Sequence, residues 1–347
     1  MDGRRFAVTP GALKACGGAT HKKGTPTICE YHEPNVSAEA FLAGLARVIR
    51  ANQTDDGPCV GCRYLQAPTK TPKHPFTGSF FAGISLHDFC GCNSRCVYCA
   101  GSEYFLPAKY VASQDHEILF RNLFDSGLIE PKRTAVSWGG GEPTLVKTFD
   151  RTVQFLSSNH IREVINTSGI RFSPAIWRAL EEGTATVRIS VDSGTNGTYS
   201  RVKRNRHCDD VWESIRRYAA TGGDMIVKYI IFSMNSEIAE VEAFIDRCAA
   251  AGVRRICISV DVRSVWDIDP GADRLTEREL KAAAEMYNLA RSRGMSPYFE
   301  GVWSAEHLQR IGELGGFNAE VVQRTNLVHR AVRKARRLMF DRGELPH

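Results

Sequence analysis

From residue 79 onward, the sequence alternates between short apolar runs and longer amphipathic stretches. Runs rich in Val, Ile or Phe predict six strands, at residues 79–88, 134–138, 162–167, 185–191, 225–233 and 254–262. Apolar residues at helical spacing predict helices between them, at 114–126, 147–159, 173–182, 209–221 and 236–251. Repeated strand–helix units place successive strands parallel in one sheet that helices cover. The sequence therefore predicts an α/β fold with a parallel sheet.

The segments on either side of this core have a different pattern. Residues 1–78 begin with two short predicted strands joined by a Pro-Gly turn, and Ser37 then caps a predicted helix. At the other end, a capping box formed by Thr276 and Glu279 begins a helix that ends at Gly294. Residues 295–300 predict one more strand, and the basic stretch 326–342 predicts a helix with a solvated face. We expect three parts, listed in order: an N-terminal extension 1–78, a core 79–265 and a C-terminal helical extension 266–347.

The composition of the 347-residue chain is that of an ordinary globular protein, with 43% hydrophobic and 24% charged residues. No apolar run approaches the roughly 20 residues that a membrane-spanning helix needs, and no apolar secretory signal opens the chain. We therefore expect a cytoplasmic protein that does not bind membranes. In that reducing compartment the 11 cysteines are expected to be metal ligands or core residues. The formal charge of +6 fits a small anionic ligand or a solvated surface, and it is too weak to indicate nucleic acid.

Three cysteines follow the first core strand within one short loop, at Cys92, Cys96 and Cys99. Thiolates this close in sequence are able to converge on one metal centre. An iron–sulfur cluster normally takes four protein ligands, so three leave one iron open to substrate or cofactor. The alternatives are buried thiols or a closed zinc site that also uses Cys90, which we interpret as an inert residue at the end of the strand.

The C-x3-C-x2-C loop, with Tyr98 before its last cysteine, resembles the cluster loop of the radical S-adenosylmethionine (radical SAM) enzymes. The next strand ends in a second similar feature, a Gly-Gly-Glu-Pro segment that contains Gly140, Gly141 and Glu142. In that family the segment meets the amino group of the SAM methionine moiety. The resemblance implies a partial (β/α)6 TIM-like barrel with a 4Fe-4S cluster on the three cysteines and SAM bound beside Tyr98. A simple glycine turn is the alternative, but the segment follows a strand, at the end where α/β barrels place their sites.

Polar residues also end the third and fourth core strands. The third strand ends with Asn166, and the fourth ends with Arg188, Ser190 and Asp192. The resemblance implies that Ser190 and Asp192 contact the ribose of SAM or the substrate, that Arg188 meets the SAM carboxylate, and that Asn166 is a weaker contact of the same kind. Ser and Asp after a strand are also common helix caps, and that alternative stays open.

Substrate groups are expected on the later strands, at Lys228, Asp261 and Glu300. Lys228 lies between apolar neighbours, where an ammonium is costly unless it is paired, so it is a candidate for binding an anion. Cys208 lies just before a predicted helix, whose N-terminus lowers the pKa of a thiol. Because some radical SAM epimerases use a cysteine as hydrogen donor, Cys208 is a candidate catalytic residue, with a small buried side chain as the alternative.

The N-terminal extension contains a second possible ligand set, formed by Cys16, Cys29, Cys59 and Cys62. A Cys-x2-Cys pair on a glycine-containing turn is a common metal-binding arrangement, because both sulfurs point to one side. The order is similar to the auxiliary-cluster segments of some radical SAM families, although those usually follow the core. A second Fe-S cluster, a structural zinc and no metal all remain open.

The resemblance implies an enzyme that cleaves SAM reductively to methionine and a 5′-deoxyadenosyl radical, which abstracts hydrogen from a substrate. We expect a small molecule, such as a sugar, nucleoside or sugar nucleotide in natural-product (antibiotic) biosynthesis, with flavodoxin or ferredoxin as electron donor. The outcome of the reaction is left open among epimerisation, dehydrogenation, lyase or decarboxylase chemistry and C–C bond formation. The alternatives are a peptide-modifying radical SAM maturase and a non-catalytic Fe-S or zinc protein. Binding of single-stranded nucleic acid is not expected, because the sequence lacks interleaved aromatic and basic residues.

Overall fold

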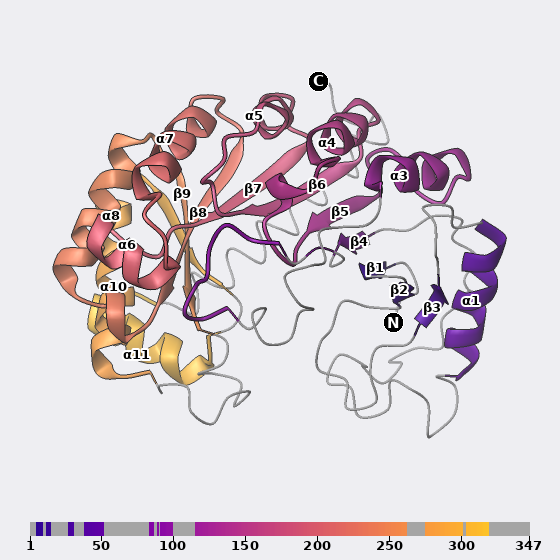
Figure 1. Ribbon diagram of the computed structural model, residues 1–347. Helices are drawn as coiled ribbons and strands as arrows, with labels where there is room; N and C mark the ends of the chain where they lie inside the picture. The colour runs from indigo at the N-terminus through magenta and orange to yellow at the C-terminus, as the bar shows by residue number, and fades with distance from the viewer. Residues whose placement is uncertain are drawn as a thin grey trace, which may run out of the picture. The chain divides into compact units, whose positions relative to one another are not determined.

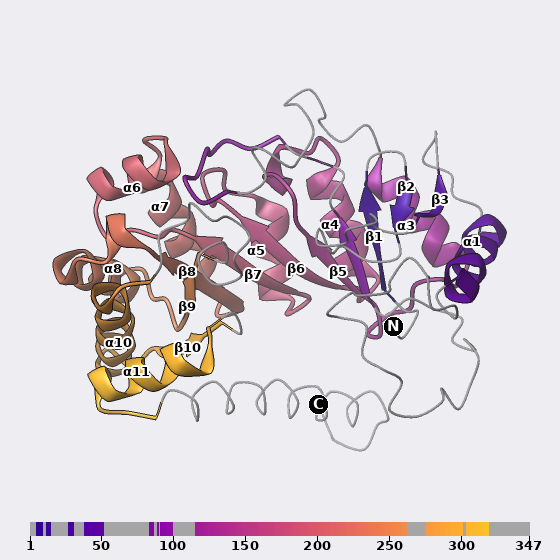
Figure 2. The ribbon, with the colours of Figure 1, turned by 90° about the horizontal axis from the view of Figure 1, so that it is seen from below.

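The computed structural model of the chain is shown in Figures 1 and 2. It describes residues 5–9, 12–14, 27–30, 38–51, 83–86, 89, 91–99, 115–261, 275–300 and 303–318. The chain divides into two compact units. The first consists of Met1–Cys92, Ala100–Asn166 and Ser173–Thr186, and the second of Asn93–Cys99, Thr167–Phe172 and Val187–His347.

The first unit is built on a sheet with the strand order β6-β5-β4-β1-β2-β3. Its strands are β1 (Arg5–Thr9), β2 (Ala12–Lys14), β3 (Thr27–Glu30), β4 (Gly83–Leu86), β5 (Ala135–Trp138) and β6 (Arg162–Thr167). The β1–β2 hairpin around the predicted Pro-Gly turn is antiparallel, as is β2–β3, whereas β1–β4, β4–β5 and β5–β6 are parallel. The N-terminal strands therefore extend the edge of the parallel sheet.

Among the described residues, the first unit contains four α-helices. They are α1 (Ala38–Ala51), α3 (His116–Asp125), α4 (Phe149–Ser158) and α5 (Pro174–Glu181), with a 3₁₀ turn η1 at Pro143–Leu145. Asp115 caps α3 and Ser173 caps α5 through side-chain oxygens that accept from backbone N–H groups. In Figure 1, α3, α4 and α5 lie along one face of the strands β4–β6. Val136, Leu156 and Ile165 pack in the buried layer between them.

The second unit contains the strand order β10-β9-β8-β7, with its helices on the outer side in Figure 1. The strands are β7 (Ala185–Ser190), β8 (Asp224–Ile231), β9 (Arg255–Val260) and β10 (Ser296–Phe299). The helices are α6 (Asn196–Lys203), α7 (Cys208–Ala219), α8 (Ile238–Ala250), α10 (Glu277–Ser292) and α11 (Ala305–Gly315), with a 3₁₀ turn η2 at Ser233–Asn235. The pairings β8–β9 and β9–β10 are parallel. Tyr229, Phe244, Ile258 and Met286 are buried in the core of this unit.

The predicted α/β class is confirmed, and each of the six predicted core strands overlaps an observed one. The first is shorter than predicted in the described residues, because only 83–86 of the predicted 79–88 is assigned as strand. The additional strand at 295–300 and the helix after Thr276 are also present, and the capping box of Thr276 and Glu279 is formed. Two helices, α6 and α11, were not predicted. The three-part division at residues 78 and 265 differs from the two compact units and stays a prediction about domain organisation.

Other predictions lie outside the described residues. They concern the cap Ser37, the end of the first strand at Cys90, the basic stretch 326–342, and Cys16, Cys59 and Cys62 of the possible auxiliary site. Cys29 lies on β3, but its side chain is not described. Among the described helices, none combines the length and the apolar composition needed to cross a lipid bilayer.

Candidate functional site

The cysteine loop of the second unit, Asn93–Cys99, is held by two backbone hydrogen bonds to the end of α6. The amide of Arg95 donates to the carbonyl of Lys203 and that of Val97 to Val202, both at 3.0 Å. Two side-chain bonds add to this attachment: Ser168 Oγ donates to Asn93 Oδ1, and Asn205 Nδ2 donates to Ser94 Oγ, both at 3.0 Å. The loop is therefore fixed although it contains no regular secondary structure.

The predicted ligands form no disulfide and have access to solvent. Cys92, the last residue of the first unit in this region, and Cys99 are exposed, and Cys96 is half-buried. Burial raises the pKa of the Cys96 thiol, and the nearby ammonium of Lys203 acts in the opposite direction. Among the described residues, no three Cys, His, Asp or Glu side chains are grouped to hold a metal ion.

A buried cluster of charged and phenolic groups lies directly behind the loop. The ammonium of Lys203 contacts Asp192 Oδ2 and donates to the Tyr98 hydroxyl at 2.6 Å, and that hydroxyl donates to the same Asp192 oxygen at 2.6 Å. The side chains of Lys203 and Asp192 are 4% and 0% exposed. Burial raises the pKa of Tyr98 well above its usual value, and the charge of Asp192 adds to the effect. The phenol therefore stays protonated and acts as a hydrogen-bond donor.

The backbone of Asp192 adopts a left-handed conformation, with φ of 58°. This turn lets Oδ1 accept from the amide of Ile230 at 2.7 Å, while the Asp192 carbonyl accepts from Asn235 Nδ2 at 2.9 Å. Both carboxylate oxygens of Asp192 therefore bind groups of the protein. The predicted contact of Asp192 with a ribose stays a prediction, and the structure adds a role that the sequence did not indicate: Asp192 links the cysteine loop to β8 and α6.

The glycine-rich segment lies in the first unit, where its amides bind the chain that follows β4. The amides of Gly139, Gly141 and Glu142 donate to the carbonyls of Leu86, Phe89 and Gly91 at 3.1, 3.0 and 2.8 Å. Gly140 has φ of 92°, a conformation that side chains disfavour, which explains the need for glycine there. These bonds place the segment at the carboxyl ends of β4 and β5, which is the end of the strands where this fold carries its sites.

The carboxylate of Glu142 is 2% exposed and caps the turn η1. Its Oε1 accepts from the hydroxyl and the amide of Thr144, at 2.6 and 3.2 Å. Asn166, at the end of β6, is exposed, and its Nδ2 donates to the carbonyl of Trp138 at 2.8 Å. Contacts of Gly140, Gly141, Glu142 and Asn166 with a cofactor stay predictions.

Two of the predicted substrate residues, Lys228 and Glu300, meet in the second unit, where the charge of Arg188 also acts on Glu300. Lys228 Nζ pairs with Glu300 Oε2 at 2.6 Å, and Ser259 Oγ donates to the same oxygen at 2.6 Å. Lys228 therefore has an anionic partner, which offsets the cost of an ammonium group among apolar neighbours. Burial raises the pKa of Glu300, but Lys228, the hydrogen bonds and Arg188 outweigh burial and lower it overall, so Glu300 is a carboxylate at neutral pH.

Arg188 is the cation of this cluster with unused hydrogen-bonding capacity. Its Nε is buried and has no hydrogen-bond partner in the described part of the chain. Its charge also acts on the thiol of Cys257, whose pKa burial raises to about 11. Asp261 follows β9 and is 8% exposed. The structure thus brings Arg188, Lys228 and Glu300 together, but places Arg188 with the substrate candidates rather than at the end of its strand with Ser190.

Cys208 was predicted to lie just before a helix; it is the first residue of α7 and is 1% exposed. The expected lowering of its pKa is wrong, because burial raises the pKa and outweighs the guanidinium of Arg247, whose Nη1 lies 3.3 Å from the sulfur. The burial favours the alternative that we kept open, a small buried residue. Its role as a hydrogen donor stays a prediction.

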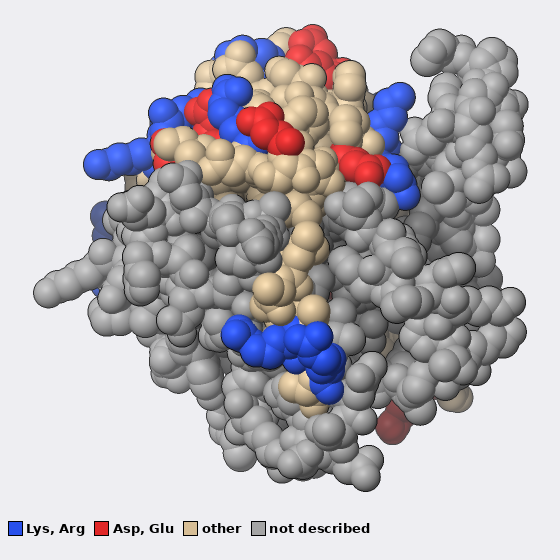
Figure 3. All heavy atoms as spheres, turned by 90° about the vertical axis from the view of Figure 1, so that its right-hand side faces the viewer, with Lys and Arg blue, Asp and Glu red and all other residues tan. Residues whose placement is uncertain are grey.

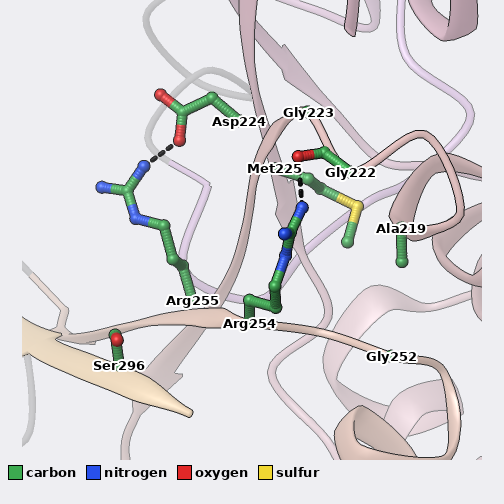
Figure 4. A pocket seen from close by; sticks show the side chains of 9 residues that line it. All are labelled: Ala219, Gly222, Gly223, Asp224, Met225, Gly252, Arg254, Arg255 and Ser296. Atoms are coloured by element: carbon green, nitrogen blue, oxygen red, sulfur yellow. Dashed lines mark hydrogen bonds and ion pairs between the residues drawn. The ribbon is translucent and has the colours of Figure 1, made fainter. Parts of the chain in front are cut away.

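The described cavities do not coincide with these residues. One, of about 440 Å³, lies at the amino-terminal ends of β8, β9 and β10, and Figure 4 shows Arg254 and Arg255 on its wall. Arg254 is bound to the carbonyl of Gly222 and Arg255 to Asp224, so both guanidinium groups have partners. Sites in parallel α/β folds lie at the opposite, carboxyl ends of the strands. We therefore assign the site from the polar side chains at those ends and not from this cavity.

Sequence reasoning missed Lys203 and Glu240. Glu240, on α8, accepts from the amides of Gly194 and Thr195 at 2.6 and 2.8 Å and from the hydroxyl of Thr195 at 2.9 Å. It thereby fixes the turn that follows Asp192. Neither residue has a local signal: Lys203 is one of several basic residues in a polar stretch, and Glu240 is one acidic residue in the first turn of an amphipathic helix.

Comparison with known proteins identifies this region. Residues 87–248 match the model of the radical SAM superfamily. The chain is 25% identical over 133 residues to a GTP 3′,8-cyclase of Clostridium botulinum, a match that covers 38% of this chain and 41% of the relative. It is 25% identical over 190 residues to the mycofactocin maturase MftC of Mycobacterium tuberculosis, covering 53% of this chain and 47% of the relative. The chain thus spans less than half the length of these curated relatives.

Among solved structures, the chain resembles SuiB of Streptococcus suis, which was crystallised with its precursor peptide SuiA. The TM-score is 0.51 at 15% identity, and the match covers 82% of this chain and 60% of SuiB. This likeness shows a shared fold and supports the predicted partial TIM-like barrel. The family match includes the cysteine loop, the glycine-rich segment and the cluster of Tyr98, Asp192 and Lys203. Residues 87–248 of this chain form a radical SAM superfamily domain.

Proposed function

We propose that this chain is an enzyme that cleaves SAM reductively and abstracts a hydrogen atom from a small anionic substrate. The observation that carries the reaction class is the set of three cysteines, none in a disulfide, at the anchored loop within the residues that match the radical SAM model. When bound, a 4Fe-4S cluster with SAM supplies the electron that splits the sulfonium bond and the radical that abstracts hydrogen. The six cysteines whose side chains are described form no disulfide, and we propose a reducing, cytoplasmic location.

The cysteine spacing is that of the cluster loop that the family implies. Cys92, Cys96 and Cys99 offer three thiols within eight residues, and two of them are exposed. Four irons with three cysteine ligands leave one iron open. We assign the cluster to these three residues, and an auxiliary cluster on Cys16, Cys29, Cys59 and Cys62 stays part of the proposal.

Residues of this chain would position the cofactor. The Lys203–Asp192–Tyr98 cluster holds the loop from behind, so that its thiols keep one arrangement. The amides of the glycine-rich segment are bound to the chain after β4, and we propose that Gly140, Gly141 and Glu142 face the methionine moiety. We propose Ser190 and Asn166, at the carboxyl ends of β7 and β6, as further cofactor contacts.

The substrate class follows from the charges on the inner face of β7–β10. Arg188 and Lys228 are cations, and the described structure neutralises them with the single carboxylate of Glu300. A carboxylate or phosphate of a substrate would accept from the buried Arg188 Nε, which has no partner in the described residues. A nucleotide or sugar phosphate fits this chemistry, and Asp261 is positioned at the end of β9 to accept a hydroxyl.

A peptide-modifying maturase is a second candidate. The match to the maturase MftC spans 190 residues, longer than the 133 residues matched in the GTP 3′,8-cyclase. In that case the anionic group would be a peptide carboxylate, bound by the same Arg188.

The reaction class is tested by anaerobic reconstitution followed by measurement of iron and of 5′-deoxyadenosine formed with dithionite as reductant. We expect Cys96→Ala to lose the cluster and the product, and Cys248→Ala, which removes a buried thiol on α8, to keep both. A Cys96→Ala protein with wild-type iron and product would refute the assignment. In the same assay, iron near 8 rather than 4 per chain, reduced by Cys59→Ala, would support the auxiliary cluster.

The substrate class is tested by titrating the reconstituted protein with GTP, a sugar phosphate and a short acidic peptide. We expect one of these anions to stimulate 5′-deoxyadenosine formation and Arg188→Gln to weaken its binding at least tenfold. Unstimulated SAM cleavage should be unchanged in that variant. Equal binding by wild type and Arg188→Gln would refute the anionic site, and stimulation by the peptide alone would select the maturase.

A further inference from the structure

Four exposed arginines surround the cysteine loop in the second unit. Arg95 is part of the loop, Arg201 lies in the last turn of α6, and Arg204 and Arg206 follow that helix. We call this set the arginine surface. The bonds from Arg95 to Lys203 and from Asn205 to Ser94 fix these segments against each other. Figures 1 and 2 both show α6 beside the loop.

The positive charge of the arginine surface is not neutralised by the described residues around it. None of its four guanidinium groups pairs with a carboxylate in the described ranges, and Arg201 donates only to the hydroxyl of Thr198, at 2.9 Å. The acids that follow in sequence are engaged elsewhere: Asp210 pairs with His207 at 2.8 Å, and Asp209 lies 3.9 Å from Arg247.

One described surface differs in part. On the face toward α1 and α3 (Figure 3), a lower group of Lys and Arg has no Asp or Glu beside it among the residues drawn, but in the upper part Lys and Arg lie among Asp and Glu. There Arg121 pairs with Glu117 at 2.6 Å, and Arg151 contacts Asp115 and Glu117. Paired charges of this kind give a local potential near zero, whereas four unpaired cations attract an acidic partner over about a Debye length, roughly 8 Å in physiological salt.

We propose that the arginine surface docks an acidic electron-donor protein of the flavodoxin or ferredoxin class. The inference rests on the proposed function, in which each SAM cleavage consumes one electron. The donor would be oxidised by one electron and the cluster on Cys92, Cys96 and Cys99 reduced by one, with no bond formed between the two proteins. Arg95 is adjacent to Cys96 in sequence, so a partner bound there lies next to a proposed cluster ligand.

An acidic protein suits this surface better than single-stranded nucleic acid. Bases bind to exposed aromatic faces as well as to cations. Two aromatic residues of the described segments that carry the arginine surface are turned inward: Tyr199 is 1% exposed, and the hydroxyl of Tyr98 is bound to Asp192. Charge complementarity with few apolar contacts is typical of fast, transient association, which suits repeated electron delivery.

The test compares Arg204→Glu/Arg206→Glu with a control of equal charge change, Lys281→Glu/Arg291→Glu, both exposed on α10. Binding of oxidised flavodoxin and of a ferredoxin is titrated calorimetrically at 50 and 300 mM NaCl. We expect the arginine variant to bind one of them at least tenfold more weakly at 50 mM, with a smaller salt dependence than wild type. The control should bind as wild type does.

Two further measurements separate this proposal from the proposed function. Reduction of the cluster by flavodoxin hydroquinone or reduced ferredoxin, followed by stopped-flow absorbance, should slow in the arginine variant, while dithionite-driven SAM cleavage should not change. Failure of dithionite-driven cleavage in wild type would refute the proposed function and leave the binding titration interpretable. The docking proposal is overturned if both variants bind the donors equally, or if only a single-stranded RNA probe loses affinity in the arginine variant.

Discussion

Replacing Lys203 with methionine should loosen the cysteine loop, because it leaves the Asp192 carboxylate buried without its cation. The two side chains are 4% and 0% exposed, so water does not replace the lost partner. Removal of one member of a buried ion pair typically costs 3–5 kcal/mol. Asp192 keeps two donors, the Tyr98 hydroxyl at 2.6 Å and the Ile230 amide at 2.7 Å. We therefore expect the lower end of that range, about 3 kcal/mol, or roughly a hundredfold in an opening equilibrium.

The assay combines urea unfolding with hydrogen exchange of the peptide that spans residues 93–99. Lys203→Met should lower the stability of the second unit and speed exchange of the Arg95 and Val97 amides, which donate to Lys203 and Val202. Adding Asp192→Asn removes the unpaired charge, and asparagine tolerates the left-handed backbone at this position. The double variant should therefore recover at least half of the loss.

Lys281→Met is the matched control, since Lys281 is exposed on α10 and should show no measurable change. The reasoning is refuted if Lys203→Met unfolds like this control. It is also refuted if the two changes at Lys203 and Asp192 add without interaction, because independent effects would mean that the charges do not stabilise each other.

Three other predictions follow from packing and from pKa shifts. A Cβ at Gly194 would overlap backbone atoms of α8, so Gly194→Ala should lower the free energy of unfolding by about 1–3 kcal/mol. Gly197 lies in open space on α6, so Gly197→Ala should raise it by up to about 1 kcal/mol. Similar urea midpoints for the two variants would contradict this prediction. Burial raises the pKa of Glu163 well above its usual value. The stability that its protonated form contributes is lost as the pH rises through the folded-state pKa, so the gain in stability of Glu163→Gln over wild type should be larger at pH 9 than at pH 5. An equal gain at the two pH values would refute this reasoning. For Glu300 the pKa is lowered, so the stability from its pair with Lys228 is present above the unfolded-state pKa and is lost as the pH falls through the folded-state pKa. Glu300→Gln should therefore lose about 1–2 kcal/mol of unfolding free energy at pH 7 and less near pH 4. A loss of the same size at both pH values would count against the ion pair.

The elements that the sequence predicted well are those with a strong period. Strand β7 alternates buried and half-buried residues, and α4 and α8 bury one stripe of apolar side chains. Helix α6 was missed because Asn196, Gly197 and Thr198 are poor helix formers and its face is mostly polar. It forms where Thr195 caps it and where its last carbonyls bind the cysteine loop. Tertiary contacts, not local propensity, therefore decide this element.

The candidate site divides in the same way. The positions of the cysteines, the glycine-rich segment and the polar ends of the strands follow from sequence motifs. The partner of Asp192 does not, since Lys203 lies 11 residues away across a turn that no local rule describes. Lys228 could be recognised as needing a partner, but its partner Glu300 is brought close only by the β8–β9–β10 succession. Arg188 could be recognised from the sequence as a polar strand residue. The residues that lie near it, Lys228 and Glu300, could be known only from the order of the strands in the sheet.

The contact between Lys203 and Tyr98 also determines when, during synthesis of the chain, the cysteine loop becomes anchored. The two residues are 105 positions apart, so the cysteines leave the ribosome well before the lysine that anchors their loop. At roughly 5–20 residues per second, the nascent loop waits for several seconds without its anchor. Ile230, the other donor to Asp192, is made later still. A cluster inserted before then would meet an unfixed loop, so iron delivery to this chain is best timed after the synthesis of β8.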